Sequence, residues 1–210
     1  MTVIRAIVVT LLYVFFATSA QAHPHVWVTM KTELVYAPDG KITGVRQAWS
    51  FDDMYSSFAL QGLGSGGVGD YTREELAPLA KENVGSLKEH DYFINVFADG
   101  AKVPLDDPQS DYWFELKDEF LTLHFMLPFN TPVRAKQLRI EIYDLSGFIA
   151  FAFDKRTPVR LVGAPQCKLN FAMPGEMDVI ENKALGQIPA RSKAMAWGEQ
   201  FANKILMNCP

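Results

Sequence analysis

The sequence predicts a mainly β fold with helices, an α+β protein with a β-sandwich-like core. Several runs alternate apolar and polar residues with the two-residue period of a strand that buries one face. Turn signals such as Pro-Asp-Gly, Asp-Gly and Ser-Gly separate these runs. Short strands spaced in this way favour a sandwich or an open barrel, and of these we expect the sandwich.

The first two strands are expected to form a hairpin. Residues 25–37 and 41–51 both alternate, and Pro38-Asp39-Gly40 between them is a turn signal. The remaining strand-rich runs are expected at residues 91–104, 111–129, 134–153 and 157–162.

Two segments carry helical signals. A helix-loop-helix insertion is expected at about residues 52–89, where Thr72 and Glu75 have the spacing of a capping box at the start of the second helix. A C-terminal helix is expected at about residues 190–207, because apolar residues such as Trp197 and Phe201 fall on one helical face.

The N-terminal segment predicts export. Arg5 is followed by an apolar run over residues 6–18 and then by Ala20-Gln21-Ala22, a cleavage pattern of small residues. The apolar run is shorter than the roughly 20 residues of a membrane-spanning helix. We therefore expect residues 1–22 to be a signal peptide and residues 23–210 to form a single periplasmic domain.

The cysteine and charge content of the sequence narrows the range of possible functions. Cys167 and Cys209 are the two cysteines, and in an exported protein such a pair indicates a disulfide rather than a thiol or metal pair. The net charge of −4 gives no general attraction to nucleic acid, so we expect no nucleic-acid partner. We also expect no enzyme, because the nucleophile-elbow, His-Glu-x-x-His and Cys-x-x-Cys motifs are absent from the sequence.

A glycine-rich patch at residues 62–69 resembles two binding motifs without their chemistry. Gly64, Gly66 and Gly69 match a dinucleotide-binding spacing, but a helix-like segment precedes them where that motif needs a strand, so no nucleotide partner is expected. Aligned to a calcium-binding EF-hand loop, Gly69 takes the turn position and Glu75 the last position. The first, third and fifth positions lack carboxylates, so calcium binding is not expected.

A histidine pair opens the mature chain. Alternation places His23, His25 and Trp27 on one face of the first strand, so both imidazoles can reach one ion. Cleavage after Ala22 adds the α-amine of His23, which forms a chelate ring with its own imidazole. Cleavage after Ala20 would instead leave Gln-Ala-His, a nitrogen set suited to Cu(II) or Ni(II). The competing interpretation is that the pair merely starts a strand at a mobile chain end.

Two aspartates and a third histidine complete the candidate set. Asp52 and Asp53 follow the second strand, so the hairpin is expected to return them toward the histidine pair, as ligands or as acceptors that orient an imidazole. Their alternative role is N-capping of the next helix. His124 faces away from the apolar side of its strand and is the preferred further ligand over His90, although both have structural roles as alternatives.

The motifs Ala-His-Pro-His-Val-Trp-Val, Trp-Ser-Phe-Asp-Asp-Met-Tyr, Leu-Lys-Glu-His-Asp-Tyr-Phe and Tyr-Asp-Leu-Ser-Gly-Phe, taken in order, resemble domain-of-unknown-function family 1007. Members are exported proteins described as the periplasmic component of an uncharacterised ABC-type transport system, and they are associated with nickel and cobalt permeases. The resemblance implies a metal role for His23, His25, Trp27, Asp52 and Asp53. The family's glycine-rich loop is frequently acidic and this one is not, so the resemblance implies no calcium site here.

Two functional hypotheses follow from these observations. In the first, the protein is a periplasmic accessory of a metal transport system that binds Ni, Co, Cu or Zn through its N-terminal histidines and serves an inner-membrane permease. Trp27 and Trp49 are then structural residues near the site. In the second, it is a non-enzymatic β-sandwich interaction module for a permease, with no metal of its own. A third hypothesis is an oxidative copper enzyme built on a histidine brace, which would need a third nitrogen ligand and an open substrate face.

Overall fold

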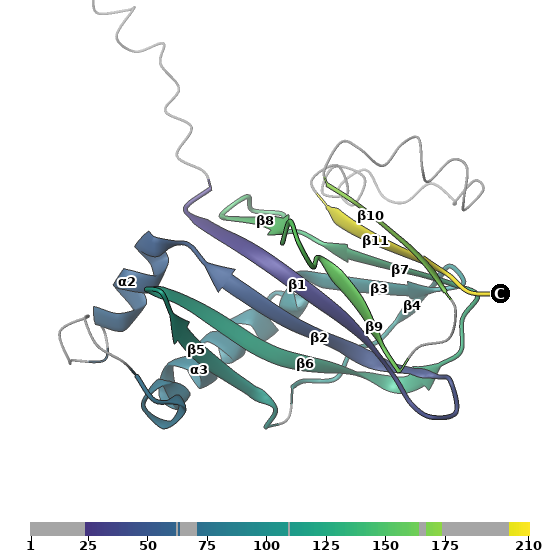
Figure 1. Cartoon of the computed structure of the whole chain (residues 1–210), viewed down its shortest axis with the longest axis horizontal. Coiled ribbons are helices and arrows are strands. Elements are labelled where there is room, and N and C mark those ends of the chain that lie inside the picture. The colour runs from purple at the N-terminus through teal and green to yellow at the C-terminus, as the bar shows by residue number, and fades with distance from the viewer. Residues whose placement is uncertain (1–23, 62, 64–70, 109, 164–166, 174–201) are drawn as a thin grey trace, which may run out of the picture.

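The computed structural model describes residues 24–61, 63, 71–108, 110–163, 167–173 and 202–210. Two β-sheets and two α-helices make up this part of the chain (Figure 1). The expected α+β fold with a sandwich-like core is therefore confirmed.

The larger sheet is built around the first strand of the chain. Its order is β5-β6-β2-β1-β8, with β9 also paired to β1. Neighbours are antiparallel except that β1 runs parallel to β8 and β9. The strands are β1 (Val26–Tyr36), β2 (Ile42–Phe51), β5 (Tyr112–Lys117), β6 (Phe120–Val133), β8 (Ile149–Phe153) and β9 (Val159–Val162).

The smaller sheet has the order β10-β11-β7-β3-β4 and is antiparallel throughout. Its strands are β3 (Ile94–Ala98), β4 (Ala101–Val103), β7 (Gln137–Ile142), β10 (Lys168–Ala172) and β11 (Asn203–Asn208). Figure 1 shows this sheet lying beside the larger one, with the C-terminus at the end of the molecule away from helix α2.

The predicted hairpin is confirmed by the pairing of β1 with β2. The register runs from Val28 opposite Phe51 to Tyr36 opposite Ile42, with a bulge near the turn. Gly40 has a φ of 79°, which is the left-handed conformation that this turn requires and that glycine adopts without steric cost. Alternate residues of β1 are buried, as the two-residue pattern predicts.

Helices α2 (Asp53–Gln61) and α3 (Arg73–Lys88) occupy the expected insertion, followed by the short 3-10 helix η1 (Asp91–Phe93). The Thr72 hydroxyl accepts from the backbone N–H of Glu75, whose carboxylate accepts from the N–H of Thr72. This pair of reciprocal bonds is the predicted capping box, and it starts α3 at Arg73.

The prediction of a C-terminal helix is wrong for the residues of that segment that the structure describes. Residues Asn203–Asn208 form strand β11, which lies between β7 and β10. Five of its six residues are buried, so both of its faces are covered and the two-residue alternation of a strand is absent from its sequence. Residues 190–201 of the expected helix lie outside the described residues.

The predicted disulfide between Cys167 and Cys209 is present in the structure. Lys168 of β10 pairs with Asn208 of β11, so the two cysteines extend this antiparallel ladder by one position. The bridge therefore joins two adjacent strands rather than a strand and a helix.

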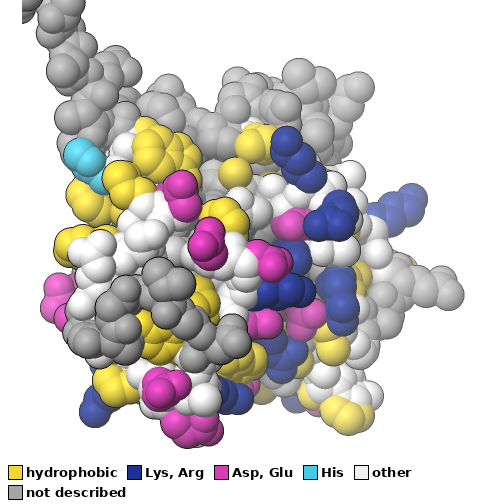
Figure 2. All heavy atoms as spheres, turned by 60° about the vertical axis from the view of Figure 1, so that its left-hand side comes forward, with side chains coloured by type: hydrophobic (Ala, Val, Ile, Leu, Met, Phe, Trp, Pro, Cys, Tyr) yellow, Lys and Arg dark blue, Asp and Glu magenta, His cyan; other side chains and the backbone are white. Residues whose placement is uncertain are grey.

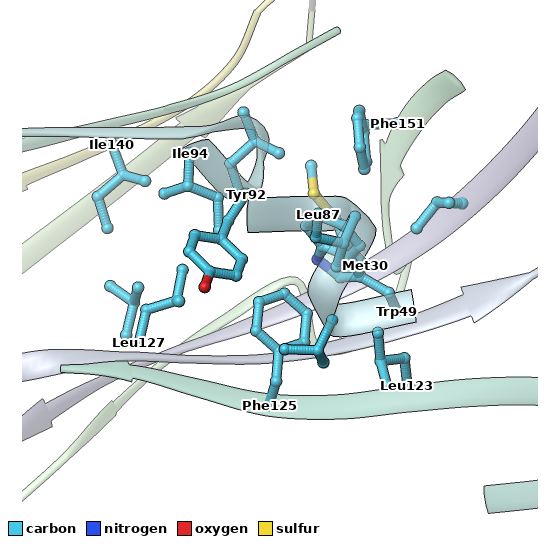
Figure 3. Packing of buried hydrophobic residues seen from close by; sticks show 14 of the residues in the cluster. Met30, Trp49, Leu87, Tyr92, Ile94, Leu123, Phe125, Leu127, Ile140 and Phe151 are labelled. Atoms are coloured by element: carbon cyan, nitrogen blue, oxygen red, sulfur yellow. The ribbon is translucent and has the colours of Figure 1, made fainter. Parts of the chain in front are cut away.

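One hydrophobic core contains side chains from both sheets and from the helices (Figure 3). Trp49 is fully buried and meets the rings of Phe125 and Phe151 edge-on, each at 4.9 Å between centroids. Its indole N–H donates to the Gln47 side-chain oxygen, which also accepts from the hydroxyl of Thr32. Trp49 is therefore part of the hydrophobic core.

Candidate functional site

The start of β1 is held by the turn that follows β7. The backbone N–H of His25 donates to the carbonyl of Phe148 at 2.9 Å, and the two rings lie 5.0 Å apart. His25 itself is exposed. His23 lies outside the described residues, so the structure gives the position of only one histidine of the pair.

Asp52 binds the start of β1 with its carboxylate. One oxygen accepts from the backbone N–H of Trp27 at 2.7 Å, and the other accepts from the N–H of Tyr55 at 2.8 Å. The N–H of Asp52 in turn donates to the carbonyl of Trp27. Asp52 thus caps α2 and joins the two ends of the hairpin. It lies near the start of β1, as expected from the hairpin, and it also has the N-capping role that the sequence offered as the alternative.

The hairpin brings Asp52 near His25. Asp52 follows the residue opposite Val28, so it lies beside Trp27, two positions along β1 from His25. Such a diagonal separates Cα atoms by about 7–8 Å. Asp53 is exposed at the first turn of α2, where one carboxylate oxygen accepts from the N–H of Met54. Asp53 therefore keeps one oxygen without a protein donor in the described residues.

His124 does not join this group. Lys31 of β1 lies opposite Ala48, which lies opposite His124 on β6. Lys31 is six residues from His25, which corresponds to about 20 Å along a strand. The expectation that His124 could complete a site with the N-terminal histidines is wrong for this reason.

The surroundings of His124 explain its presence on β6. Its ring stacks on Trp113 at 4.7 Å, and its Nε2 lies 3.1 Å from a carboxylate oxygen of Glu115. Arg73 covers the Trp113 ring at 4.3 Å. This row of side chains joins the start of α3 to the larger sheet, which is a structural role. His90 likewise stacks on Phe93, at 5.1 Å.

Within the described ranges, His, Cys, Asp and Glu side chains form no group of three or more that could hold a metal ion. The nitrogen donors that the sequence offers are the imidazoles of His23 and His25 and an α-amine at a cleaved end. These would come from His23 and His25, two positions apart in the sequence, and need no cluster elsewhere in the fold.

Next to His25 lies a cleft that the sequence did not predict. Its volume is about 1250 Å³. Helices α2 and α3, the 3-10 helix, the ends of β1 and β2 and the turn at residues 143–149 enclose it. Buried side chains line it, including those of Trp49, Phe51 and Leu87, together with the partly buried ring of Phe93.

Large apolar side chains stand exposed around this cleft. Phe58 of α2 is 73% exposed and Leu145 is 56% exposed, although both line the cleft. Met54, Trp27 and Phe148 are also exposed hydrophobic residues at this end of the molecule. Figure 2 shows hydrophobic side chains gathered here together with acidic ones, while most Lys and Arg side chains in that view lie farther to the right. Clustering of this kind is a mark of a binding surface.

Three polar side chains that line the cleft, those of Tyr55, Asn83 and Ser86, are already bonded to the fold. The Tyr55 hydroxyl donates to the side-chain oxygen of Asn83, whose amide donates to the carbonyl of Leu79. Burial raises the pKa of the Tyr55 phenol, so this hydroxyl stays protonated and remains a donor. The Ser86 hydroxyl donates to the carbonyl of Glu82. The cleft therefore presents mainly apolar surface to an occupant.

Sequence signals for the cleft existed but were not recognised. Met54 and Phe58 lie four residues apart on α2 and share one face of it, which is an apolar pair. Leu145 and Phe148 flank a Ser-Gly turn, where polar residues are usual. Apolar residues at positions that local structure leaves exposed are the signal for such a surface.

The fold and this cleft define a class: an α+β sandwich protein with a mainly apolar cleft between two helices and a turn. No helix in the described part of the chain is long and apolar enough to cross a membrane. The model of the family described as "Protein of unknown function (DUF1007)" matches residues 8–209, and the chain belongs to this family. A search of the curated proteins found no match.

Proposed function

We propose that the protein is a periplasmic accessory of a nickel/cobalt-type metal transport system, and that it binds a transition metal ion through the mature N-terminal His23-Pro24-His25. The observation that supports this most is the fixation of His25. Its backbone is bonded to Phe148, and the next residues of β1 are bonded to Asp52. A ligand attached to a rigid strand has a defined position, as a metal site requires.

The donor chemistry fits a borderline ion. Two imidazoles and an amine suit Ni, Co, Cu or Zn better than Ca or Mg, which prefer oxygen ligands. Asp53 follows Asp52 at the start of α2 and offers a carboxylate oxygen. The protein captures or hands over the ion and catalyses no reaction.

Native mass spectrometry tests the proposal on protein that has been exported to a periplasm and carries no N-terminal tag. We expect a chain that begins at His23 and carries one Ni, Co, Cu or Zn ion. We expect His25→Ala to lose the ion and to keep the unfolding midpoint of the parent. His124→Ala is the matched control and keeps the ion, since His124 is about 20 Å away. A parent chain that stays metal-free when offered all four ions refutes the proposal.

The cleft favours a second candidate, the non-enzymatic interaction module for a membrane permease. Exposed Phe58 and Leu145 beside a large apolar cleft support a protein partner rather than an ion. The two candidates are separable, because His25→Ala removes metal without changing the helices of the cleft. If the alanine variant still binds its partner, the interaction does not require the ion.

A further inference from the structure

We propose that the cleft between α2, α3 and the turn at residues 143–149 binds a peptide segment of a partner protein, apolar on one side and positively charged on the other. This inference rests on the interaction-module candidate and is independent of metal binding. Three observations support it: the volume of the cleft, the hydrogen bonds that its polar side chains already make, and the negative charge of the side chains at its edge.

The cleft is larger than a site for one small molecule. Small-ligand pockets have volumes of about 300–1,000 Å³, whereas this cleft has about 1250 Å³. Its apolar lining continues outward onto Phe58 and Leu145, which are more than half exposed. An occupant that covers these side chains as well as the interior must be extended, as the apolar face of a helix or strand is.

The bonded polar groups argue against a polar small molecule. Recognition of such a ligand depends on a few convergent donors and acceptors. Here Tyr55, Asn83 and Ser86 are bonded to each other or to α3. The Asp144 carboxylate accepts from the N–H of Ser146 and the N–H of Ile149 within its own turn. The interior therefore discriminates by shape and apolar area.

The charges at the cleft have one sign. Glu82, Glu89, Asp91 and Asp144 line it, and no Lys or Arg is found among the described residues that do so. The first three are exposed, so their carboxylates can meet a partner at the edge of the cleft. Complementary charge at an interface rim guides encounter and rejects partners of the same sign. A segment with Lys or Arg beside its apolar face fits this edge.

The same charges separate a peptide from a lipid surface. Anionic lipids attract basic patches, and four acidic side chains at the cleft would be repelled from them. An acidic apolar helix of a partner is disfavoured for the same reason. We therefore assign the cleft to a cationic amphipathic peptide.

Fluorescence anisotropy with designed peptides tests this assignment on the metal-free mature protein. The first probe is a Leu/Lys peptide of about 15 residues, long enough to form a helix on binding, with Leu on one helical face. The second replaces every Lys by Glu, and the third keeps the Leu/Lys composition in an order that breaks the apolar face. We expect binding of the first probe at least about tenfold tighter than that of the other two.

Variants locate the binding at the cleft. Phe58→Ser is expected to weaken the Leu/Lys peptide by about tenfold or more, as the loss of an exposed aromatic anchor does. Glu82→Lys is expected to weaken it by several-fold and to reduce its salt dependence. Glu74→Lys is the matched control, because Glu74 is exposed on α3 outside the cleft lining. It should leave the affinity within about twofold.

Three results would overturn the assignment. The first is no measurable binding of the Leu/Lys peptide. The second is equal weakening by Glu74→Lys and by the cleft variants, which indicates general charge attraction. The third is binding to phosphatidylglycerol vesicles that Phe58→Ser abolishes while the peptide stays unbound, which assigns the cleft to lipid. None of these three results depends on bound metal, so the peptide-binding test remains valid if the metal proposal fails.

Discussion

Replacement of Asp52 by alanine should destabilise the protein through two separate hydrogen bonds. One carboxylate oxygen caps α2 at the N–H of Tyr55, and the other accepts from the N–H of Trp27. Loss of an N-cap costs about 1 kcal/mol. Loss of a hydrogen bond to a charged acceptor near solvent adds about 1–1.5 kcal/mol. We therefore expect Asp52→Ala to lower the free energy of unfolding by about 2–2.5 kcal/mol.

Two further variants separate these contributions. Asp52→Asn has one acceptor oxygen and can keep the cap, so we expect it to lose about 1 kcal/mol. Asp53→Ala removes only a local bond to Met54 and a favourable first-turn charge, so we expect a loss of about 0.5 kcal/mol. Urea titration monitored by circular dichroism measures all three against the parent.

The relative losses of unfolding free energy in the three variants test this reasoning. If Asp53→Ala costs as much as Asp52→Ala, the clamp on Trp27 is not a stabilising contact and the reasoning fails. The metal content of the Asp52→Asn variant adds a second readout. Retained metal assigns Asp52 to positioning the start of β1, whereas loss of metal in a folded variant assigns its carboxylate to the ion.

Three further predictions concern the rest of the fold. The double serine variant of Cys167 and Cys209 should lose about 4 kcal/mol in urea titrations, because the bridge closes a separation of 42 residues; an unchanged midpoint would contradict this. Gly44→Ala should cost about 1–3 kcal/mol, since a Cβ there collides with backbone of β6. Gly85→Ala, in open space on α3, should instead stabilise by about 1 kcal/mol, and a cost like that at Gly44 would refute the distinction. The pKa of the Asp154 carboxyl is lowered, chiefly because its carboxylate accepts from the backbone N–H of Thr157. The stabilising effect of this carboxylate is therefore present above about pH 4 and is lost as the pH falls further. Asp154→Asn should make the free energy of unfolding less dependent on pH in that acidic range, and an unchanged slope would contradict this.

The parts of the fold that sequence reasoning predicted are those with local signals. The β1–β2 hairpin has alternating burial and a glycine turn within 26 residues, from Val26 to Phe51. The capping box at Thr72 and Glu75 is equally local. Both depend on neighbours in the chain, so one sequence suffices to recognise them.

Strand β11 was missed because its environment is not local. Ile205 and Leu206 are both about 1% exposed although they point to opposite faces of the sheet. A strand covered on both faces has no polar alternation, and its apolar residues also match a helical face. Only the pairing with β7 and β10 distinguishes the two interpretations.

The candidate site was predicted in part for the same reason. The return of Asp52 to the start of β1 followed from the hairpin and is present in the structure. The distance between His124 and His25 depends on the order and register of β6, β2 and β1, which cannot be derived from the sequence alone. The cleft combines α2, α3 and a turn more than 50 residues later in the chain, so no single stretch of sequence contains it.

The strand order also constrains how the protein is made. β11 lies between β7 and β10, and both precede it along the chain. During synthesis from the N-terminus, the position between them stays empty until the residues from Asn203 onward arrive. In the larger sheet, β1 likewise waits for β8, more than 110 residues later, to cover one of its edges. Neither sheet can be completed on a partly synthesised chain, so the last steps of folding wait until nearly the whole chain is available.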